Sequence, residues 1–255
     1  AIFNTDDERC AELCERENHK TFGIFSPADA HADNISEVRF ENGFGVQFYV
    51  SYGGATTKCR IPMPYNFTVY NSLAAISACT HFGVPLDVCA AALEDFSLEG
   101  RFEKVASDAP FDIVIDYAHN GESLKNALLA ARKFCAGKLI CVFGSVGERT
   151  EMRRKALGEA ANANADVCVI TSDNPNFEDP VKIAREIAAL VTDKPYKIIA
   201  DRKEAIEYAV SIAERGDFVL LAGKGHEKYQ LVRGEKVPFD ERQIIKEATK
   251  TKIQI

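Results

Sequence analysis

The chain has 255 residues, of which 46% are hydrophobic and 27% charged, and its formal net charge is −7. This composition is typical of a soluble globular protein with one large domain or two smaller ones. The negative charge argues against a nucleic-acid-binding surface, and no apolar run approaches the ~20 residues that span a membrane, so we expect neither partner.

The first block of the chain, residues 1–98, mixes strand and helix patterns. Residues 1–10 look like the end of a strand, an acidic loop and the start of a helix. Helical patterns follow at 67–82 and 85–96. Four segments before these helices have strand character and are separated by Gly and Asn breaks: 20–25, 35–40, 43–52 and 56–63. Because the first residue is Ala and not Met, we expect a fragment or a processed chain.

From about Gly100 strand and helix patterns alternate strictly. The expected strands are five apolar segments: 111–118, 138–144, 165–171, 196–200 and 217–223. The expected helices are the segments between and after them: 121–135, 151–164, 180–191, 202–214 and 240–250. This alternation predicts an α/β fold with a doubly wound, mostly parallel sheet and helices on both of its faces.

Such a sheet binds its ligands at the carboxyl ends of its strands. Four polar, charged or glycine-rich loops are expected there: 116–120, 144–150, 172–179 and 223–227. AGKGHE (222–227) places Lys224, His226 and Glu227 beside two glycines, although a hairpin turn would also need one Gly. TSDNPNFEDP (171–180) suits a binding loop, and equally a turn with a helix cap.

Other motifs limit the kind of site. The glycines of VFGSVGERT (142–150) suggest an anion cradle. No G-x-x-x-x-G-K-[ST] phosphate loop is present, and no G-x-G-x-x-G follows a strand, which argues against a dinucleotide oxidoreductase.

Cys10 and Cys14 have helical spacing without a second pair, so we expect no metal ligands. The other cysteines lie mostly in apolar patterns, which favours a reducing, cytoplasmic compartment.

Taken in order, six motifs resemble the C-terminal domain of the Mur ligases: GRFEKV, DYAH, VFGSVGERT, TSDNPNFEDP, DRKEAIEYA and AGKGHEKYQ. Within that family they most resemble the UDP-N-acetylmuramoyl-dipeptide ligases of the MurE type. Upstream, FNTDDE (3–8) and FTVYNSLAA (67–75) are similar to two segments of the central ATPase domain. The resemblance implies a partial central domain at 1–98 that lacks its phosphate loop, and a complete Rossmann-like C-terminal domain at 99–255.

The resemblance also implies a reaction. In this family ATP phosphorylates the carboxylate of UDP-MurNAc-L-Ala-D-Glu, and the amine of a free diamino acid attacks the acyl phosphate, with Mg²⁺ offsetting charge. Arg101 would reach the ATP phosphates, His119 would lie close to the ribose-binding Asp116, and Arg101 and His119 would be the catalytic residues. Asn71 would bind adenine and Asp116 the ribose. The implied amino-acid pocket consists of Arg149, Asp173, Asn174, Asn176, Gly223 and Glu227. Arg149 suits the α-carboxylate and Glu227 the ammonium.

Three departures from the family pattern matter. The GKT loop, the magnesium-binding acid and the carbamylated lysine are absent, so we expect this chain alone neither to hydrolyse ATP nor to ligate. Thr68 stands where the family has Asn near adenine. DNPN replaces the DNPR of the diaminopimelate-adding enzymes, so Asn176 offers no cation, while Asp173, Glu178 and Glu227 add negative charge. A cationic side chain such as that of L-lysine or ornithine fits this balance better.

Two other functions stay open. The chain could be a non-catalytic Mur-like module that binds a nucleotide or a partner. It could also belong to another amide ligase, such as a folylpolyglutamate or cyanophycin synthetase, against which AGKGHE and DNPN argue together. The oligomeric state cannot be read from the sequence.

Overall fold

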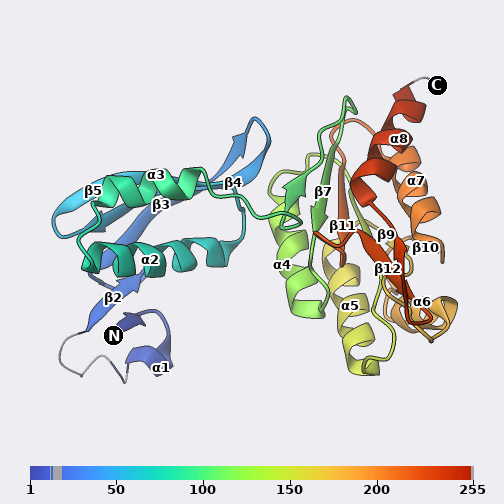
Figure 1. Cartoon of the computed structure of the whole chain (residues 1–255), viewed down its shortest axis with the longest axis horizontal. Coiled ribbons are helices and arrows are strands. Elements are labelled where there is room, and N and C mark those ends of the chain that lie inside the picture. The colour runs from blue at the N-terminus through green and yellow to red at the C-terminus, as the bar shows by residue number, and fades with distance from the viewer. Residues whose placement is uncertain (12, 14–18, 254–255) are drawn as a thin grey trace. The chain divides into compact units, whose positions relative to one another are not determined.

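The computed structural model describes residues 1–11, 13 and 19–253. The chain divides into two compact units, 1–97 and 98–255 (Figure 1). Cys14 lies outside the described residues, whereas Cys10 lies in a short helix, α1 (Glu8–Ala11). None of the helices in the described part combines the length and the apolar character needed to cross a membrane.

The first unit contains one five-stranded sheet in the order β1-β2-β3-β4-β5. β1 to β3 are parallel, and β3 to β5 are antiparallel. The strands are β1 (Ile2–Asn4), β2 (Lys20–Gly23), β3 (Ala30–Phe40), β4 (Gly43–Tyr52) and β5 (Ala55–Ile61). β3 begins five residues before the segment that the sequence predicted. It continues through an irregularity between Asp33 and Ser36, where Asn34 has a φ of 52°. Asn tolerates this left-handed conformation better than most residues.

Two helices cover this sheet, α2 (Asn66–His81) and α3 (Leu86–Glu94), as the sequence predicted. α2 buries Val69, Leu73 and Ile76, which recur at helical spacing. They pack in one core cluster with the inward side chains of the strands, Val46, Phe48, Val50 and Ile61 among them. The unit therefore has a hydrophobic core of its own.

The second unit contains a six-stranded sheet in the order β10-β9-β8-β11-β7-β6. All neighbouring pairs are parallel except β6 with β7. The strands are β6 (Glu103–Lys104), β7 (Asp112–Asp116), β8 (Leu139–Phe143), β9 (Val167–Ile170), β10 (Tyr196–Ile198) and β11 (Phe218–Ala222). The helices are α4 (Gly121–Arg132), α5 (Glu151–Asn164), α6 (Pro180–Ala188), α7 (Arg202–Ile212) and α8 (Glu241–Ile253). The predicted mostly parallel α/β sheet is confirmed.

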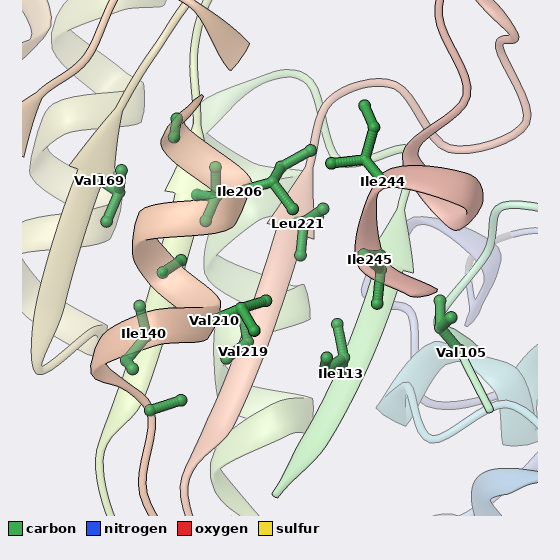
Figure 2. Packing of buried hydrophobic residues seen from close by; sticks show 14 of the residues in the cluster. Val105, Ile113, Ile140, Val169, Ile206, Val210, Val219, Leu221, Ile244 and Ile245 are labelled. Atoms are coloured by element: carbon green, nitrogen blue, oxygen red, sulfur yellow. The ribbon is translucent and has the colours of Figure 1, made fainter. Parts of the chain in front are cut away.

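Both faces of this sheet are buried. Alternate side chains of a strand point to opposite faces, and Val219 and Leu221 of β11 belong to a cluster with Ile206 and Val210 of α7. Figure 2 shows these residues facing one another, with Ile244 and Ile245 of α8 beside them. α4 packs against β8 and β11 and buries Leu124 and Leu128. Figure 1 shows α4 and α5 on the face opposite α7 and α8.

Polar caps start the helices directly after the loops at the sheet edge. Asn120 and Ser123 form a capping box at α4, in which each side chain bonds the other residue's backbone N–H. Asp179 caps α6, whose first residue is Pro180, and Asp201 caps α7. These caps fix the point where each loop ends.

Besides the short strand β6, the sequence did not predict the hairpin of β12 (Tyr229–Val232) and β13 (Glu235–Pro238). Its turn residues, Arg233 and Gly234, both have positive φ, 49° and 81°. Positive φ at both positions is the type I′ geometry that matches the twist of a hairpin. The strands lack the buried apolar alternation on which the prediction relied, because they are half-buried or exposed.

Candidate amino-acid and nucleotide site

A cavity of about 210 Å³ lies at the carboxyl ends of β7, β8, β9 and β11. It brings together His119, Arg149, Asp173, Asn174, Gly223 and Glu227, which the sequence had assigned to a site. The other lining residues are Tyr117, Val146 and Arg153. The position agrees with the general rule for parallel sheets.

The charged groups of the cavity have opposite signs. Arg149 lies just before α5 and Arg153 in its first turn, while Asp173 and Glu227 follow β9 and β11. Nε of Arg153 donates to the carbonyl oxygen of His119 at 2.9 Å, which orients its guanidinium. Burial, and then the nearby charge of Arg149, lower the pKa of Arg153. Two neighbouring guanidinium groups are suited to pairing with an anionic group.

A buried lysine joins the acidic residues. Nζ of Lys224, whose side chain is 0% exposed, lies 2.8 Å from Oδ1 of Asn174, 2.9 Å from Oε2 of Glu227 and 3.5 Å from Oδ1 of Asp173. Nδ2 of Asn174 donates to the same Oε2 of Glu227 at 3.0 Å. Burial opposes the ionisation of Glu227, but the bonds from Lys224 and Asn174 outweigh it and lower the pKa of this carboxyl.

Asn176, the residue that distinguishes DNPN from DNPR, does not line the cavity. Its Oδ1 accepts from the backbone N–H of Gly234 at 2.8 Å, and its Nδ2 donates to Glu148 at 2.5 Å. Its backbone pairs with the β12–β13 hairpin through Leu231 and Arg233. The side chain therefore holds the hairpin, and a direct contact with an amino acid stays a prediction.

Glu178 does not add negative charge to the cavity. Arg154, 3% exposed, donates to both of its oxygens, and Glu178 also accepts from the backbone N–H of Glu148. The hydrogen bonds from Arg154 lower the pKa of Glu178 to about 2. Because this acid is paired, the excess of negative charge inferred from the sequence is wrong for Glu178.

Asp116, assigned to the ribose, is 2% exposed. Its Oδ2 accepts from the backbone N–H of Phe102 and its Oδ1 from that of Ala118, each at 2.7 Å. Phe102 has a φ of 49°, and the hydrogen bond that its N–H donates to Asp116 stabilises this left-handed conformation. In the described structure Asp116 thus fixes the turn that carries Arg101, and the ribose contact stays a prediction.

Arg101 and His119 both contact the ring of Tyr117. The guanidinium of Arg101 is 4.7 Å from the centre of the Tyr117 ring, and the His119 ring is 4.8 Å from it. Nδ1 of His119 lies 2.9 Å from the carbonyl oxygen of Tyr117. A carbonyl only accepts, so Nδ1 carries a proton, and in a singly protonated ring Nε2 is then the acceptor.

Asn71, assigned to adenine, is exposed on α2 of the first unit. Thr68, one turn earlier, is 5% exposed, and its Oγ1 has no hydrogen-bond partner among the described residues. The adenine contact of Asn71 stays a prediction.

The glycines of VFGSVGERT bring two loops together. A Cβ added to Gly144 would lie 2.1 Å from the carbonyl oxygen of Thr171, and one added to Gly147 would lie 2.0 Å from that of Pro175. These glycines allow residues 144–147 to pack directly against 171–175. Close packing against carbonyl oxygens explains them better than the anion cradle that the sequence suggested.

The DRKEAIEYA motif supports the loops that follow β9 and β11. Arg202 is 1% exposed and donates to the carbonyl oxygens of Ser172 and Ala222, at 3.2 and 2.9 Å. Its Nε bonds Glu241 of α8 at 2.8 Å. Because Ala222 ends β11 and Ser172 follows β9, Arg202 sets the separation of the two loops that hold the acidic residues.

Sequence reasoning did not assign Tyr117, Val146 and Arg153 to the site, and it named Lys224 only as a charged residue of the AGKGHE motif. Arg153 follows Arg149 by four residues at a helix start, a spacing that places side chains together. Lys224 lies between the two glycines of AGKGHE. Among the described residues no group of three His, Cys, Asp or Glu side chains could hold a metal ion.

Residues 100–225 match the family described as "Mur ligase, glutamate ligase domain". Two similar proteins are each named UDP-N-acetylmuramoyl-L-alanyl-D-glutamate–2,6-diaminopimelate ligase. That of Caldanaerobacter subterraneus subsp. tengcongensis is 39% identical over 251 residues, covering 97% of this chain and 51% of the relative. That of Thermosynechococcus vestitus is 40% identical over 261 residues, covering 100% of this chain and 52% of the relative. The chain spans about half the length of these curated relatives.

Two solved structures are also similar. A UDP-N-acetylmuramoyl-L-alanyl-D-glutamate–2,6-diaminopimelate ligase has a TM-score of 0.69 at 26% identity, covering 99% of this chain and 53% of the other. A MurF ligase from Thermotoga maritima, solved in complex with ADP, has a TM-score of 0.65 at 17% identity, covering 100% of this chain and 54% of the other. The second likeness concerns the fold alone.

Proposed function

The chain belongs to the Mur ligase family, and we propose that it carries the amino-acid-binding part of an ATP-dependent, ADP-forming ligase in peptidoglycan synthesis. This ligase joins a free diamino acid to UDP-MurNAc-L-Ala-D-Glu. The observation that carries the proposal is the cavity, which is lined both by two arginines, Arg149 and Arg153, and by two acids, Asp173 and Glu227. At about 210 Å³ it lies below the range of ~300–1,000 Å³ of drug-sized pockets, which suits a small zwitterion.

Each end of an amino acid has a partner in the cavity. The arginines bind a carboxylate, since a guanidinium offers paired donors that match its two oxygens. Glu227 accepts from an ammonium, and its lowered pKa keeps it ionised at neutral pH. Holding the amino acid in one orientation brings its amine to the reacting carboxyl, and this proximity lowers the barrier.

The incoming residue is proposed to be L-lysine, because Asn176 supplies no cation for a second carboxylate. A second candidate, diaminopimelate, is favoured by Arg153, by the pairing of Glu178 with Arg154, and by the relatives' names. Arg149, Arg153 and Lys224 carry three positive charges against the two negative charges of Asp173 and Glu227. This balance does not disfavour a second carboxylate.

The nucleotide is proposed to be ATP. Arg101 fits a phosphate, because its guanidinium carries five donors and makes no ion pair within the described residues. His119 contributes its Nε2 beside the Tyr117 ring that Arg101 also contacts. Bound ATP supplies the phosphoryl group that activates the carboxylate. Mg²⁺ would accompany it, and no role is assigned to any residue of this chain as its ligand.

Calorimetric titration of the 255-residue chain with L-lysine, ornithine, meso-diaminopimelate and norleucine tests this function. We expect binding of a diamino acid and loss of that binding in Arg149→Ala. Arg215→Ala, at an exposed position, is the control. Competition between lysine and diaminopimelate in a full-length ligase then separates the two candidates. If neither L-lysine nor meso-diaminopimelate binds to the 255-residue chain, the proposed amino-acid site is wrong.

A further inference from the structure

Lys224 is a fully buried cation among residues that line the cavity, although it does not line the cavity itself. It follows β11 directly after Gly223, and its side chain turns into the protein toward the 173–174 loop. Burial of an ammonium is costly unless it is paired and hydrogen-bonded. A lysine in this place therefore requires a compensating interaction.

The three nearest acceptors all come from the cavity wall. They belong to Asn174, Glu227 and Asp173, at 2.8, 2.9 and 3.5 Å from Nζ. An ammonium has three protons to donate, so these acceptors use its full capacity. Lys224 thus joins the loop after β9 to the loop after β11.

These bonds determine how Glu227 meets a ligand. Lys224 and Asn174 both donate to Oε2, while Oε1 accepts no hydrogen bond among the described residues. Asn174 is also fixed, since its Oδ1 accepts from Lys224 and from the backbone N–H of Leu231. With Oε2 occupied, Oε1 is the oxygen of Glu227 that remains for a ligand's ammonium.

We propose that Lys224 is a positioning residue of the amino-acid site: its buried ammonium fixes Asn174 and Glu227 so that Glu227 presents a single oxygen to the ligand's ammonium. This inference rests on the proposed function only in naming the ligand as an amino acid. The arrangement of Lys224, Asn174 and Glu227 is independent of which amino acid binds.

The charge of Lys224 matters as well as its hydrogen bonds. Asp173 and Glu227 are two carboxylates that share this cation, and without it like-charge repulsion would favour protonation of one of them. The other titratable or charged groups around Glu227 are His226, beside it in the chain, and the lining residues Tyr117, His119, Arg149 and Arg153. None of these bonds Oε2 of Glu227 in the described structure.

The test compares Lys224→Met, which keeps an unbranched chain without charge, with Lys228→Met. Lys228 is an exposed lysine four residues later that pairs only with Glu99 within the described structure. Amino-acid affinity of each 255-residue variant is measured by calorimetry at pH 7.5 and pH 5, and folding by thermal unfolding. We expect Lys224→Met to lose at least about tenfold in affinity at pH 7.5, because hydrogen bonds to charged groups are the strong ones. The loss should increase at pH 5, while Lys228→Met behaves like the unmodified chain.

A folded Lys224→Met chain with unchanged affinity and pH dependence would overturn the proposal. If that variant does not fold, NMR of the unmodified chain decides instead. A Glu227 carboxyl that titrates below the usual Glu range, with ordered Asn174 side-chain amide protons, supports the proposal, and an ordinary titration with averaged amide signals refutes it. Both NMR measurements need no ligand, so they stand even if the unmodified chain binds no amino acid and the proposed function fails.

Discussion

Arg154 donates hydrogen bonds to both carboxylate oxygens of Glu178, at 2.8 and 2.5 Å, and so neutralises an acid that the sequence places beside the cavity. Arg154 also bonds Glu186 of α6 at 2.6 Å. α5, the 171–180 loop and α6 are thereby joined through one buried guanidinium. Glu178 of the FEDP segment thus stabilises the packing of the elements that carry the site.

This pair predicts a pH-dependent stability. The pKa of Glu178 is lowered from 4.5 to about 2 in the folded state, chiefly by Arg154. Its stabilisation is therefore complete above the unfolded-state value and is lost as the pH falls from about 4.5 toward 2. Urea unfolding of the unmodified chain and of Glu178→Gln should differ most above pH 5 and converge in acid. Glu235→Gln, exposed on β13, is the control, and a difference that stays constant down to pH 3 would refute the assignment.

Replacement of Asn176 should separate backbone strain from lost hydrogen bonds. Asn176 has a φ of 51° and bonds Gly234 and Glu148 through its side chain. Asn176→Ala loses these bonds and strains the left-handed backbone, so we expect about 2–4 kcal/mol of destabilisation. Asn176→Gly loses only the bonds and should cost about 1–2 kcal/mol. Denaturant unfolding measures both, and equal losses would show that strain does not contribute.

The same strain affects specificity. Asn176→Arg is expected to raise the use of diaminopimelate relative to lysine in a full-length ligase, since it adds a cation near the cavity. Arginine adopts a positive φ less readily than asparagine, so the variant is less stable. The ratio of kcat/KM for diaminopimelate to kcat/KM for lysine must therefore be measured under conditions in which the variant is folded. An unmodified enzyme that uses both amino acids equally would contradict the role given to Asn176.

Loss of the buried pair between Arg202 and Glu241 should be costly. Arg202→Met leaves Glu241, 1% exposed, without its cation and leaves the carbonyl oxygens of Ser172 and Ala222 without this donor. We expect about 3–5 kcal/mol of destabilisation in urea unfolding. The double variant Arg202→Met/Glu241→Leu removes both charges and should recover a large part of this loss. A double variant no more stable than Arg202→Met would show that the uncompensated charge is not the cause.

Limited proteolysis should cut between the two compact units. Residues 95–99 are exposed and lie outside the regular elements, at the boundary near residue 97. Mass spectrometry of a brief digestion should give two fragments whose common boundary lies near this position. We expect the C-terminal fragment to persist longer, because its sheet is covered by helices on both faces. First cuts within 112–222 would contradict this expectation.

The strands and helices of the second unit were predictable because their chemistry is local. β11 is a continuous apolar run, and Asn120, Asp179 and Asp201 are polar caps directly before helical patterns. The β12–β13 hairpin was not, since its turn depends on Arg233 adopting a positive φ and its side chains are not buried. That conformation is supported by Asn176, which is distant in the sequence.

For the site, the sequence supplied the residues that carry charge in recognisable motifs, such as Arg149 and Glu227. It could not tell which charges are already paired. Glu178 and Asp173 look alike in TSDNPNFEDP, but one is bonded by Arg154 of α5 and the other lies beside Lys224. Such pairings are made between residues far apart in the chain and become visible only once the loops are packed.

Gly100 and Gly225 meet backbone to backbone within the second unit. A Cβ on Gly100 would lie 2.1 Å from the backbone nitrogen of His226, and one on Gly225 would lie 2.7 Å from Cβ of Tyr117. Both glycines also have positive φ. The GRFE and GKGHE motifs therefore pack directly against each other. A side chain added at either glycine would clash even if the other glycine were kept. Random mutagenesis of this protein should leave glycine at both positions in all folded survivors, even in a selection that ignores catalysis.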